Sequence, residues 1–231
     1  GATGAVLSVR ITALPAEGQL QHRAADGGWA VVTVGQAFDA AALAAGALRF
    51  MPAAQASGGP GHVLAGEGNR RVHYARLGYV AVDGLLQSAP ASLVIDVAAL
   101  ADRPSLQLQG GATVRGSEDM SITLPEAVAA LADTDGSESL LLTLTGLPDG
   151  AVLSDGVRSF SPGSTQRVVD LSGWNLTALR LQPPANFNGT LVLQLQASAI
   201  EASTGERATV VQDLVVELAP VADAPTLVLA P

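Results

Sequence analysis

Carboxylates concentrate in one short stretch of this chain. Residues 130–140 read ALADTDGSESL, in which Asp133, Asp135 and Glu138 lie with Ser137 around a single glycine. Hard cations such as calcium take roughly six to eight oxygen ligands, most often from Asp, Glu, Asn and backbone carbonyls. Closely spaced acids repel one another unless something neutralises them. The stretch is therefore either an acidic turn left in water or half of a metal site.

The same stretch is not an EF-hand, and catalytic motifs are absent from the sequence. An EF-hand loop needs a glutamate at its twelfth position, which here would be Leu144. The sequence contains no Gly-x-Ser-x-Gly elbow, no His-Glu-x-x-His and no phosphate-binding glycine loop. His22, His62 and His73 have no partner at the spacing of a triad or a zinc site. We expect His73 on the solvent face of a strand, His22 and His62 in turns, and no enzymatic activity.

Composition limits the remaining classes. The 231 residues exceed a usual single domain of ~100 to 200 residues, so two domains are expected. There is no cysteine, which excludes disulfides and thiolate metal sites. The net charge is −9 and the twelve basic residues are all arginines that form no extended patch in the sequence, which argues against nucleic acid as a partner. No apolar run reaches the ~18 residues that a membrane-spanning helix needs, and the N-terminus GATGAVLSVR lacks the layout of a signal peptide. The chain is expected to be a piece of a longer protein.

Internal repetition is the most informative feature of the sequence. Three segments in the first half match three in the second, at separations of 133, 131 and 121 residues. The falling separation places extra residues in the first copy, as a lengthened, glycine-rich loop. The matching pairs are VRITALPAEGQL (9–20) with LTLTGLPDGAVL (142–153), ALRFMP (47–52) with ALRLQP (178–183), and VIDVAALADRPSL (94–106) with VVELAPVADAPTL (215–227).

Within each copy, polar and apolar residues alternate over short runs bounded by Gly, Pro, Asn and Asp. This pattern predicts half-buried antiparallel strands, and their number predicts a β-sandwich. Only two alanine-rich segments, 38–47 and 125–132, look helical. The expected domains are a sandwich over 1–103, truncated at its N-terminus and with a longer loop around 53–71, a second over 104–224, and the start of a third over 225–231.

Several short motifs resemble a known family. YVAVDG (79–84), a closing strand and then an Asp-x-Pro linker resemble the end of a cadherin repeat. GSEDMSITL (116–124), LADTDGSESL (131–140), LTGLPDGAVLSDG (144–156) and PPANFNG (183–189) are similar to the cadherin-like or immunoglobulin-like tandem repeats of giant bacterial surface adhesins of the RTX type. The resemblance covers nearly all of residues 104–231 and is looser over 1–103. It implies seven-stranded sandwiches arranged end to end, with calcium bound at each junction.

The resemblance also implies which residues would bind the metal. Asp102 would be the ligand from the linker, while Asp133 and Asp135 match the Asp-x-Asp pair of the following domain. Glu138 and Ser137 are further candidates at that junction. The linkers have Ala101 and Ala222 where the family carries an asparagine, which implies fewer ions and weaker binding than in animal cadherins.

Other acids fall at the neighbouring junctions. Glu118 resembles an early-strand glutamate that would serve the next junction together with Asp223, and Asp119 accompanies it. Asp83 would face the junction that precedes the first domain.

The resulting hypothesis is a non-catalytic extender of a secreted or cell-surface adhesin, with calcium as its ligand and neighbouring repeats of the same chain as its partners. An alternative from another class is a module that binds glycan or peptide through the lengthened loop of the first domain. That loop carries His62, Glu67, Arg70 and Arg71, with Trp29 as a further candidate.

Overall fold

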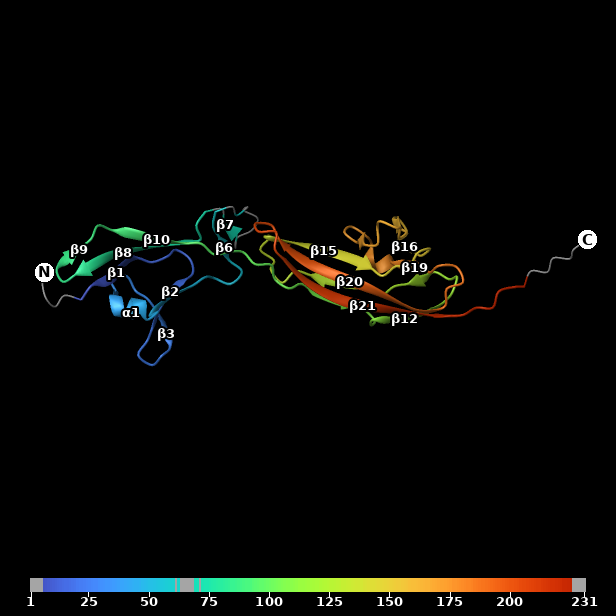
Figure 1. The fold of residues 1–231 in the computed structure, drawn as a ribbon, viewed down its shortest axis with the longest axis horizontal. Coiled ribbons are helices and arrows are strands. Elements are labelled where there is room, and N and C mark those ends of the chain that lie inside the picture. Colours follow the sequence, from blue (N-terminus) through green and yellow to red (C-terminus); the bar gives the residue numbers. More distant parts are fainter. Residues whose placement is uncertain (1–5, 61, 63–68, 71, 226–231) are drawn as a thin grey trace, which may run out of the picture. The chain divides into compact units, whose positions relative to one another are not determined.

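The protein, described by a computed structural model over residues 6–60, 62, 69–70 and 72–225, is all-β with several antiparallel sheets (Figure 1), as predicted. Contacts divide the chain into two compact units. The first unit comprises residues up to Leu100 together with 133–137 and 201–205. The second unit comprises 101–132, 138–200 and the residues from Glu206 onward.

The first unit contains a larger sheet in the order β10-β8-β1-β4, with β9 paired to β8, and a smaller sheet in the order β3-β2-β5. Strands β6 and β7 pair in parallel outside these two sheets. The elements are β1 (Ser8–Ala13), β2 (Gln19–Arg23), β3 (Trp29–Val31), β4 (Ala37–Asp39), α1 (Ala40–Ala44), β5 (Leu48–Met51), β6 (Ser57–Gly58), β7 (Asn69–Arg70), β8 (Ala75–Asp83), β9 (Leu86–Gln87) and β10 (Ala91–Ile95).

The second unit contains a sheet in the order β12-β21-β20-β15-β18, a sheet in the order β13-β19-β16-β17, and the separate pair β11-β14. Pairing is antiparallel except between β12 and β21, which run parallel. The elements are β11 (Ser105–Leu108), β12 (Thr113–Ser117), β13 (Ile122–Thr123), β14 (Ala127–Ala130), β15 (Glu138–Thr145), β16 (Val152–Ser154), β17 (Ser159–Phe160), β18 (Val169–Asp170), η1 (Leu176–Ala178), β19 (Arg180–Gln182), β20 (Gly189–Glu201) and β21 (Arg207–Ala219).

The repeated segments of the sequence fold into equivalent strands. In the first unit β1 pairs with β4 and β8, and β8 pairs with β10; in the second unit β15 and β18, and β20 and β21, pair in the same manner. The smaller sheets agree too, because β2 joins β3 to β5 as β16 joins β17 to β19. Alternation with a period of two places the same positions inward in both copies.

The cores of the two units differ in extent. In the second unit one core collects inward leucines and valines from both sheets, including Leu144, Leu193 and Leu181. The buried core of the first unit is much smaller and centres on Ile11 and Phe38. Leucine, valine and alanine make up most of the buried hydrophobic residues, so burial of aliphatic groups is the main stabilising term.

Two local predictions were wrong. Residues 125–132, expected to be helical, contain strand β14, in which Ala127 is buried and Val128 exposed, because pairing with β11 overrides the helix propensity of alanine. His22, expected in a turn, lies in β2. The other alanine-rich segment does contain a helical turn, α1, whose N-cap Asp39 accepts a hydrogen bond from the Ala42 amide at 2.6 Å.

The difference between the cores is testable at one matched position. Leu93 pairs with Leu77 in the first unit as Leu214 pairs with Leu193 in the second, but Leu93 is 52% exposed and Leu214 only 1%. Leu214→Ala is expected to lower the free energy of unfolding of the second unit by about 2 to 5 kcal/mol. Leu93→Ala should cost the first unit less than about 1 kcal/mol.

Urea unfolding measures both changes separately, because each unit contains one of the two tryptophans. Trp29→Phe leaves Trp174 to report on the second unit, and Trp174→Phe leaves Trp29 to report on the first. Equal losses for the two alanine variants would contradict the difference in burial.

Candidate metal centre

A glutamate at the start of β15 fixes the backbone of the linker. Glu138 is buried, and its Oε1 accepts a hydrogen bond from the backbone amide of Asp102 at 2.6 Å. Two of the predicted ligands are thus brought together, but through the main chain of Asp102 rather than through its carboxylate. The contact orders the linker next to the acidic stretch that precedes β15.

The stretch Asp133–Ser137 folds into two successive Asx turns. Asp133 Oδ1 accepts from the Asp135 amide at 2.9 Å, and Asp135 Oδ1 accepts from the Ser137 amide at 2.7 Å. Ser137 Oγ also lies 3.5 Å from Asp133 Oδ2. Gly136, with φ of +91°, supplies the left-handed residue that the second turn requires. The carboxylates are therefore held close together by their own turn.

One carboxylate oxygen in this turn has no partner among the described residues. Asp135 Oδ2 is buried and accepts no hydrogen bond there, although Oδ1 of the same group is bonded. A buried anionic oxygen without a donor is costly, and a bound cation removes that cost. Because calcium prefers carboxylate and carbonyl oxygens, the donor set of this turn fits the metal that the resemblance implies.

Sequence analysis missed a further buried carboxylate, Glu201. It is the last residue of β20, is 2% exposed, and its Oε1 accepts from the amide and the hydroxyl of Ser203 at 2.9 and 2.8 Å. The next amide, that of Ala202, donates to Ser137 O at 2.9 Å. Glu201 follows Leu193 and Ala197 in the inward-facing register of β20. An acid at an inward position of an alternating strand was the available signal.

A second group of acids surrounds the other linker. Glu118 is buried; its Oε1 accepts from the Val221 amide at 2.6 Å and its Oε2 from Asn188 Nδ2 at 3.1 Å. Asp119, exposed and with φ of +62°, accepts from the Asn186 amide at 2.8 Å. Glu118 therefore fixes the second linker just before Asp223, as Glu138 fixes the first linker at Asp102.

The predicted ligands do not assemble into a complete set of acidic side chains. Within the described ranges, no three His, Cys, Asp or Glu side chains come close enough together to hold a metal ion. Asp223 is exposed in its linker, and Asp83 is exposed at the end of β8. Serine hydroxyls, asparagine amides, backbone carbonyls and water also ligate calcium, and the turns around Asp133 and Asp119 contain several of these groups.

His73 was expected on the solvent face of a strand, but it lies outside the described strands. His73 precedes β8, and its Nδ1 lies 2.8 Å from Asp96 Oδ1, so it is not an isolated strand residue. His62 lies in the lengthened loop with Nε2 buried and without a partner in the described part of the chain. Arg49 and Arg23 stack on the ring of Trp29 at 4.1 and 5.0 Å.

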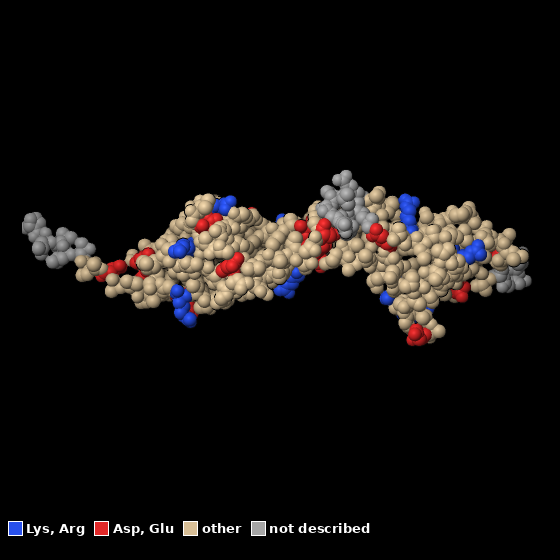
Figure 2. All heavy atoms as spheres, turned by 180° about the vertical axis from the view of Figure 1, so that it is seen from behind, with Lys and Arg blue, Asp and Glu red and all other residues tan. Residues whose placement is uncertain are grey.

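The alternative binding loop is only partly described. Of its named residues, Glu67 and Arg71 lie outside the described residues, and Arg70 is in β7. On the face shown in Figure 2, the arginine side chains lie singly, without forming a patch. No helix among the described residues is long and apolar enough to cross a membrane.

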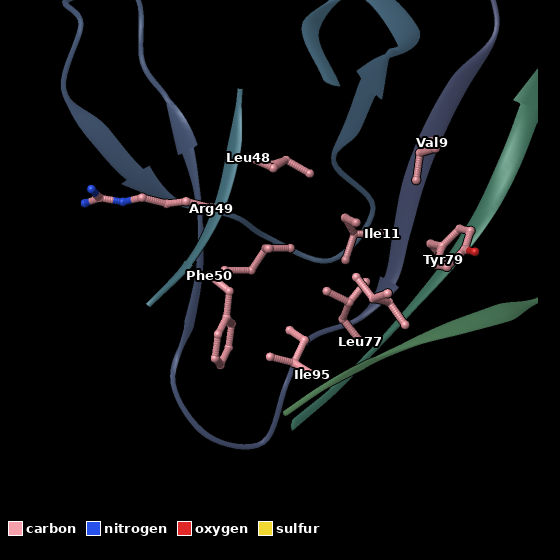
Figure 3. Close-up of a pocket in the computed structure, with 10 residues that line it drawn as sticks. Val9, Ile11, Leu48, Arg49, Phe50, Leu77, Tyr79 and Ile95 are labelled. Atoms are coloured by element: carbon pink, nitrogen blue, oxygen red, sulfur yellow. The ribbon is translucent and has the colours of Figure 1, made fainter. Parts of the chain in front are cut away.

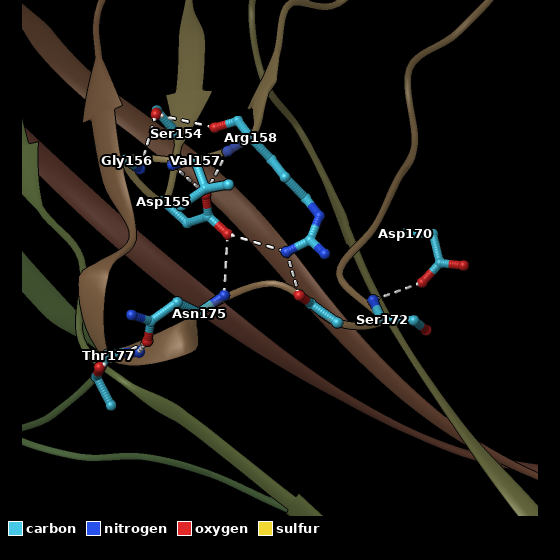
Figure 4. A network of polar contacts seen from close by, with 10 residues as sticks. Ser154, Asp155, Gly156, Val157, Arg158, Asp170, Ser172, Asn175 and Thr177 are labelled. Atoms are coloured by element: carbon cyan, nitrogen blue, oxygen red, sulfur yellow. Dashed lines mark hydrogen bonds and ion pairs between the residues drawn. The ribbon is translucent and has the colours of Figure 1, made fainter.

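Asp155, by contrast, is a structural carboxylate with a full set of donors (Figure 4). It is buried after β16 and accepts from the amides of Val157, Arg158 and Asn175 at 2.9, 2.5 and 3.0 Å. The Arg158 guanidinium contacts Asp155 Oδ2 at 3.5 Å and donates to Gly173 O. The Arg158 and Asn175 amides, which bond to the charged form, lower the pKa of Asp155 to about 2.

No family model matches this sequence, and a search of curated proteins returns no match either. The structure therefore defines a class, an all-β protein with repeated strand topology. The assignment to a family depends on the motifs of the sequence.

The pKa of Asp155 predicts how acid affects the second unit. Because the folded pKa is below the ordinary value of 3.8, the ionised group stabilises the fold above about pH 4. That contribution is lost as pH falls from about 4 to 2. Asp155→Asn should lower the urea midpoint of the Trp174 signal at pH 7, and the difference from the parent should shrink across this window.

Asp149→Asn is the matched control, because Asp149 is exposed and forms a surface ion pair with Arg167. It should leave the midpoint nearly unchanged at either pH. A difference between Asp155→Asn and its parent that persists undiminished at pH 2 would contradict the assignment.

Proposed function

We propose that this chain is a non-catalytic spacer of a secreted or bacterial cell-surface adhesin, built from tandem cadherin-like β-sandwiches whose junctions bind calcium. The observation that best supports the proposal is the buried, unpartnered Asp135 Oδ2 beside the carboxylate of Asp133. A stretch that were only a solvated acidic turn would leave its oxygens to water. A buried oxygen without a donor instead calls for a cation.

The proposed ligands at the first junction are Asp133 and Asp135, with Asp102 and Glu138 completing the set together with backbone oxygens and water. One carboxylate oxygen of Glu138 accepts a hydrogen bond from the Asp102 amide, so the first role of Glu138 is to position the linker for the metal. Calcium supplies the positive charge that turns repulsion between these acids into shared coordination.

At the second linker, Glu118 is bonded through both oxygens to Val221 and Asn188, so it acts as the holder of the linker rather than as the principal ligand. Asp119 and Asp223 are the proposed ligands there, and Asp83 is the equivalent group before the first unit. At both linkers a glutamate bonds to the linker backbone and aspartates are the proposed ligands, which supports a repeated junction.

The mechanism of the spacer is electrostatic. The chain carries a net charge of −9, so without metal its junction acids repel one another and oppose the ordered linker that the Glu138 hydrogen bond favours. With metal bound, the linker is ordered and the array stiffens. Extracellular calcium sites commonly have dissociation constants of ~10⁻⁴ to 10⁻³ M, and the alanines at 101 and 222 favour the weak end of that range.

Calcium is expected to stabilise the protein through Asp133 and Asp135. At 10 mM calcium and a dissociation constant of ~10⁻³ M, the gain in unfolding free energy is about 1.4 kcal/mol. Differential scanning calorimetry with calcium and with chelator measures it as a shift in Tm. Asp133→Ala with Asp135→Ala should abolish the shift, whereas Asp149→Ala with Asp213→Ala, which removes two exposed acids elsewhere, should preserve it. Equal responses of the two double variants would refute the site.

Calcium is also expected to stiffen the linker. Small-angle scattering should show a narrower distribution of particle dimensions with calcium than with chelator, because ordering the linker reduces the range of angles between the units. Magnesium at the same concentration is the control, since it keeps its waters and suits a smaller, rigid octahedral site. A scattering profile that calcium leaves unchanged, in a protein whose Tm calcium raises, would separate ion binding from stiffening and would contradict the spacer mechanism.

A further inference from the structure

The first unit differs from the second at the same place in both of its sheets. In the second unit β12 lies at the edge of one sheet beside β21, and β13 lies at the edge of the other beside β19. In the first unit the equivalent edges are β10 and β5, and no described strand pairs with their outer sides. Both open edges correspond to a single continuous segment of the second unit, residues 113–123.

An apolar groove of about 420 Å³ opens between these two edges (Figure 3). Leu48 and Phe50 line it from β5, and Leu93 and Ile95 line it from β10. The guanidinium of Arg49 points away from the groove in Figure 3, and it stacks on the Trp29 ring. Apart from that residue, hydrocarbon and aromatic surface forms the lining.

The equivalent positions of the second unit indicate which kind of segment fits the groove. Leu214 and Leu181, which correspond to Leu93 and Phe50, are buried, and they lie on β21 and β19, the strands that pair with β12 and β13. Ile122 lies opposite Leu181 in the strand register and is buried in the same core. A Cβ added to Gly116 would lie 2.6 Å from Ile122 Cγ1, so β12 and β13 fit together closely as one insert.

We propose that the groove between β5 and β10 is an acceptor site for an extended polypeptide segment with the pattern of residues 113–124. Such a segment would add one strand parallel to β10 and one antiparallel to β5. Main-chain hydrogen bonds to the open edges would provide affinity, and apolar side chains at the positions of Val114, Ile122 and Leu124 would provide specificity. The proposal involves no cation and stands independently of calcium binding.

The occupant is a segment whose chain leads directly into β1. In the second unit, residues 113–123 are followed by β14 and then by β15, the strand equivalent to β1. If the first unit has the same topology, the occupant precedes β1 in the chain. It would then lie 133 residues before the equivalent segment of the second unit. A separate peptide or a second copy of this chain is distinguishable by experiment.

The test joins a copy of residues 104–133 directly in front of Gly1 of the full chain, in the Trp174→Phe background so that Trp29 reports on the first unit alone. The fusion should raise the Tm of the Trp29 transition by about 5 °C or more and reduce binding of the dye ANS, which reports exposed apolar surface. An unchanged Tm with unchanged dye binding would overturn the proposal.

Variants separate groove filling from general effects of a longer chain. The same fusion with Val114, Ile122 and Leu124 of the added copy replaced by serine should give no gain, because its apolar side chains are removed. Leu93→Glu in the parent chain should abolish the gain, whereas Leu86→Glu, on an exposed strand outside the groove, should leave it intact. An equal gain in Tm from the fusion, its serine variant, and the fusions that carry Leu93→Glu or Leu86→Glu would overturn the groove as the site.

The source of the segment is tested on the unfused chain. A synthetic peptide of residues 111–126 should raise the Trp29 Tm of the unfused chain and have no effect on the fusion, in which the groove is filled. Size-exclusion chromatography with light scattering should show a monomer. A dimer that Leu93→Glu dissociates would replace the proposed occupant with a second copy of the chain.

Discussion

Burial of inward-facing aliphatic side chains on paired strands is the interaction on which this structure depends. The chain has no cysteine and few aromatic residues, so no disulfide stabilises it and aliphatic side chains outnumber rings in its cores. On β20 every second residue from Leu191 to Ala199 is buried, and the facing sheet contributes Leu153 and Leu181 to the same core. Each buried leucine among them contributes about 1.5 to 3 kcal/mol. The strands must therefore keep their register, because a slip of one residue would expose the whole set.

Buried carboxylates provide a second stabilising interaction, because they accept hydrogen bonds from irregular backbone next to that core. Glu138 and Glu118 each accept an amide from a linker, Glu201 accepts from a hairpin, and Asp155 accepts from three amides in two loops. A buried backbone amide needs an acceptor, and a charged acceptor forms a stronger bond than a neutral one. Asp135 differs in the kind of backbone it holds, because its Oδ1 accepts an amide of its own turn.

Comparison of the two units shows that the edge strands bury apolar side chains of the core. With β12 and β13 present, Leu214 is buried and the core is continuous. Where the equivalents are missing among the described strands, Leu93 is half exposed and a groove remains. The pairing of β1, β8 and β10 does not depend on them, since main-chain hydrogen bonds within that sheet are complete without an added strand. The first unit thus keeps the fold while leaving apolar surface available to an incoming chain.

The sequence by itself determined what depends on local pattern. Alternation with a period of two predicted the strands, and the repeated segments around Leu-Pro and Asp-x-Pro predicted two copies of one strand order. The spacing of Asp133 and Asp135 on either side of a threonine, with Gly136 next, predicted an acidic turn, which forms because each side chain accepts an amide two residues on.

Only the tertiary structure decided what depends on distant partners. Residues 125–132 are a strand because β11 pairs with them, a choice that alanine propensity alone opposes. The pairing of Glu138 with the Asp102 amide and of His73 with Asp96 joins residues far apart in sequence. The groove of the first unit depends on which strands flank β5 and β10. The burial of Asp135 Oδ2 depends on the residues that surround the turn. Period and turn chemistry act over a few residues, whereas burial and unpaired edges are properties of the assembled sheets.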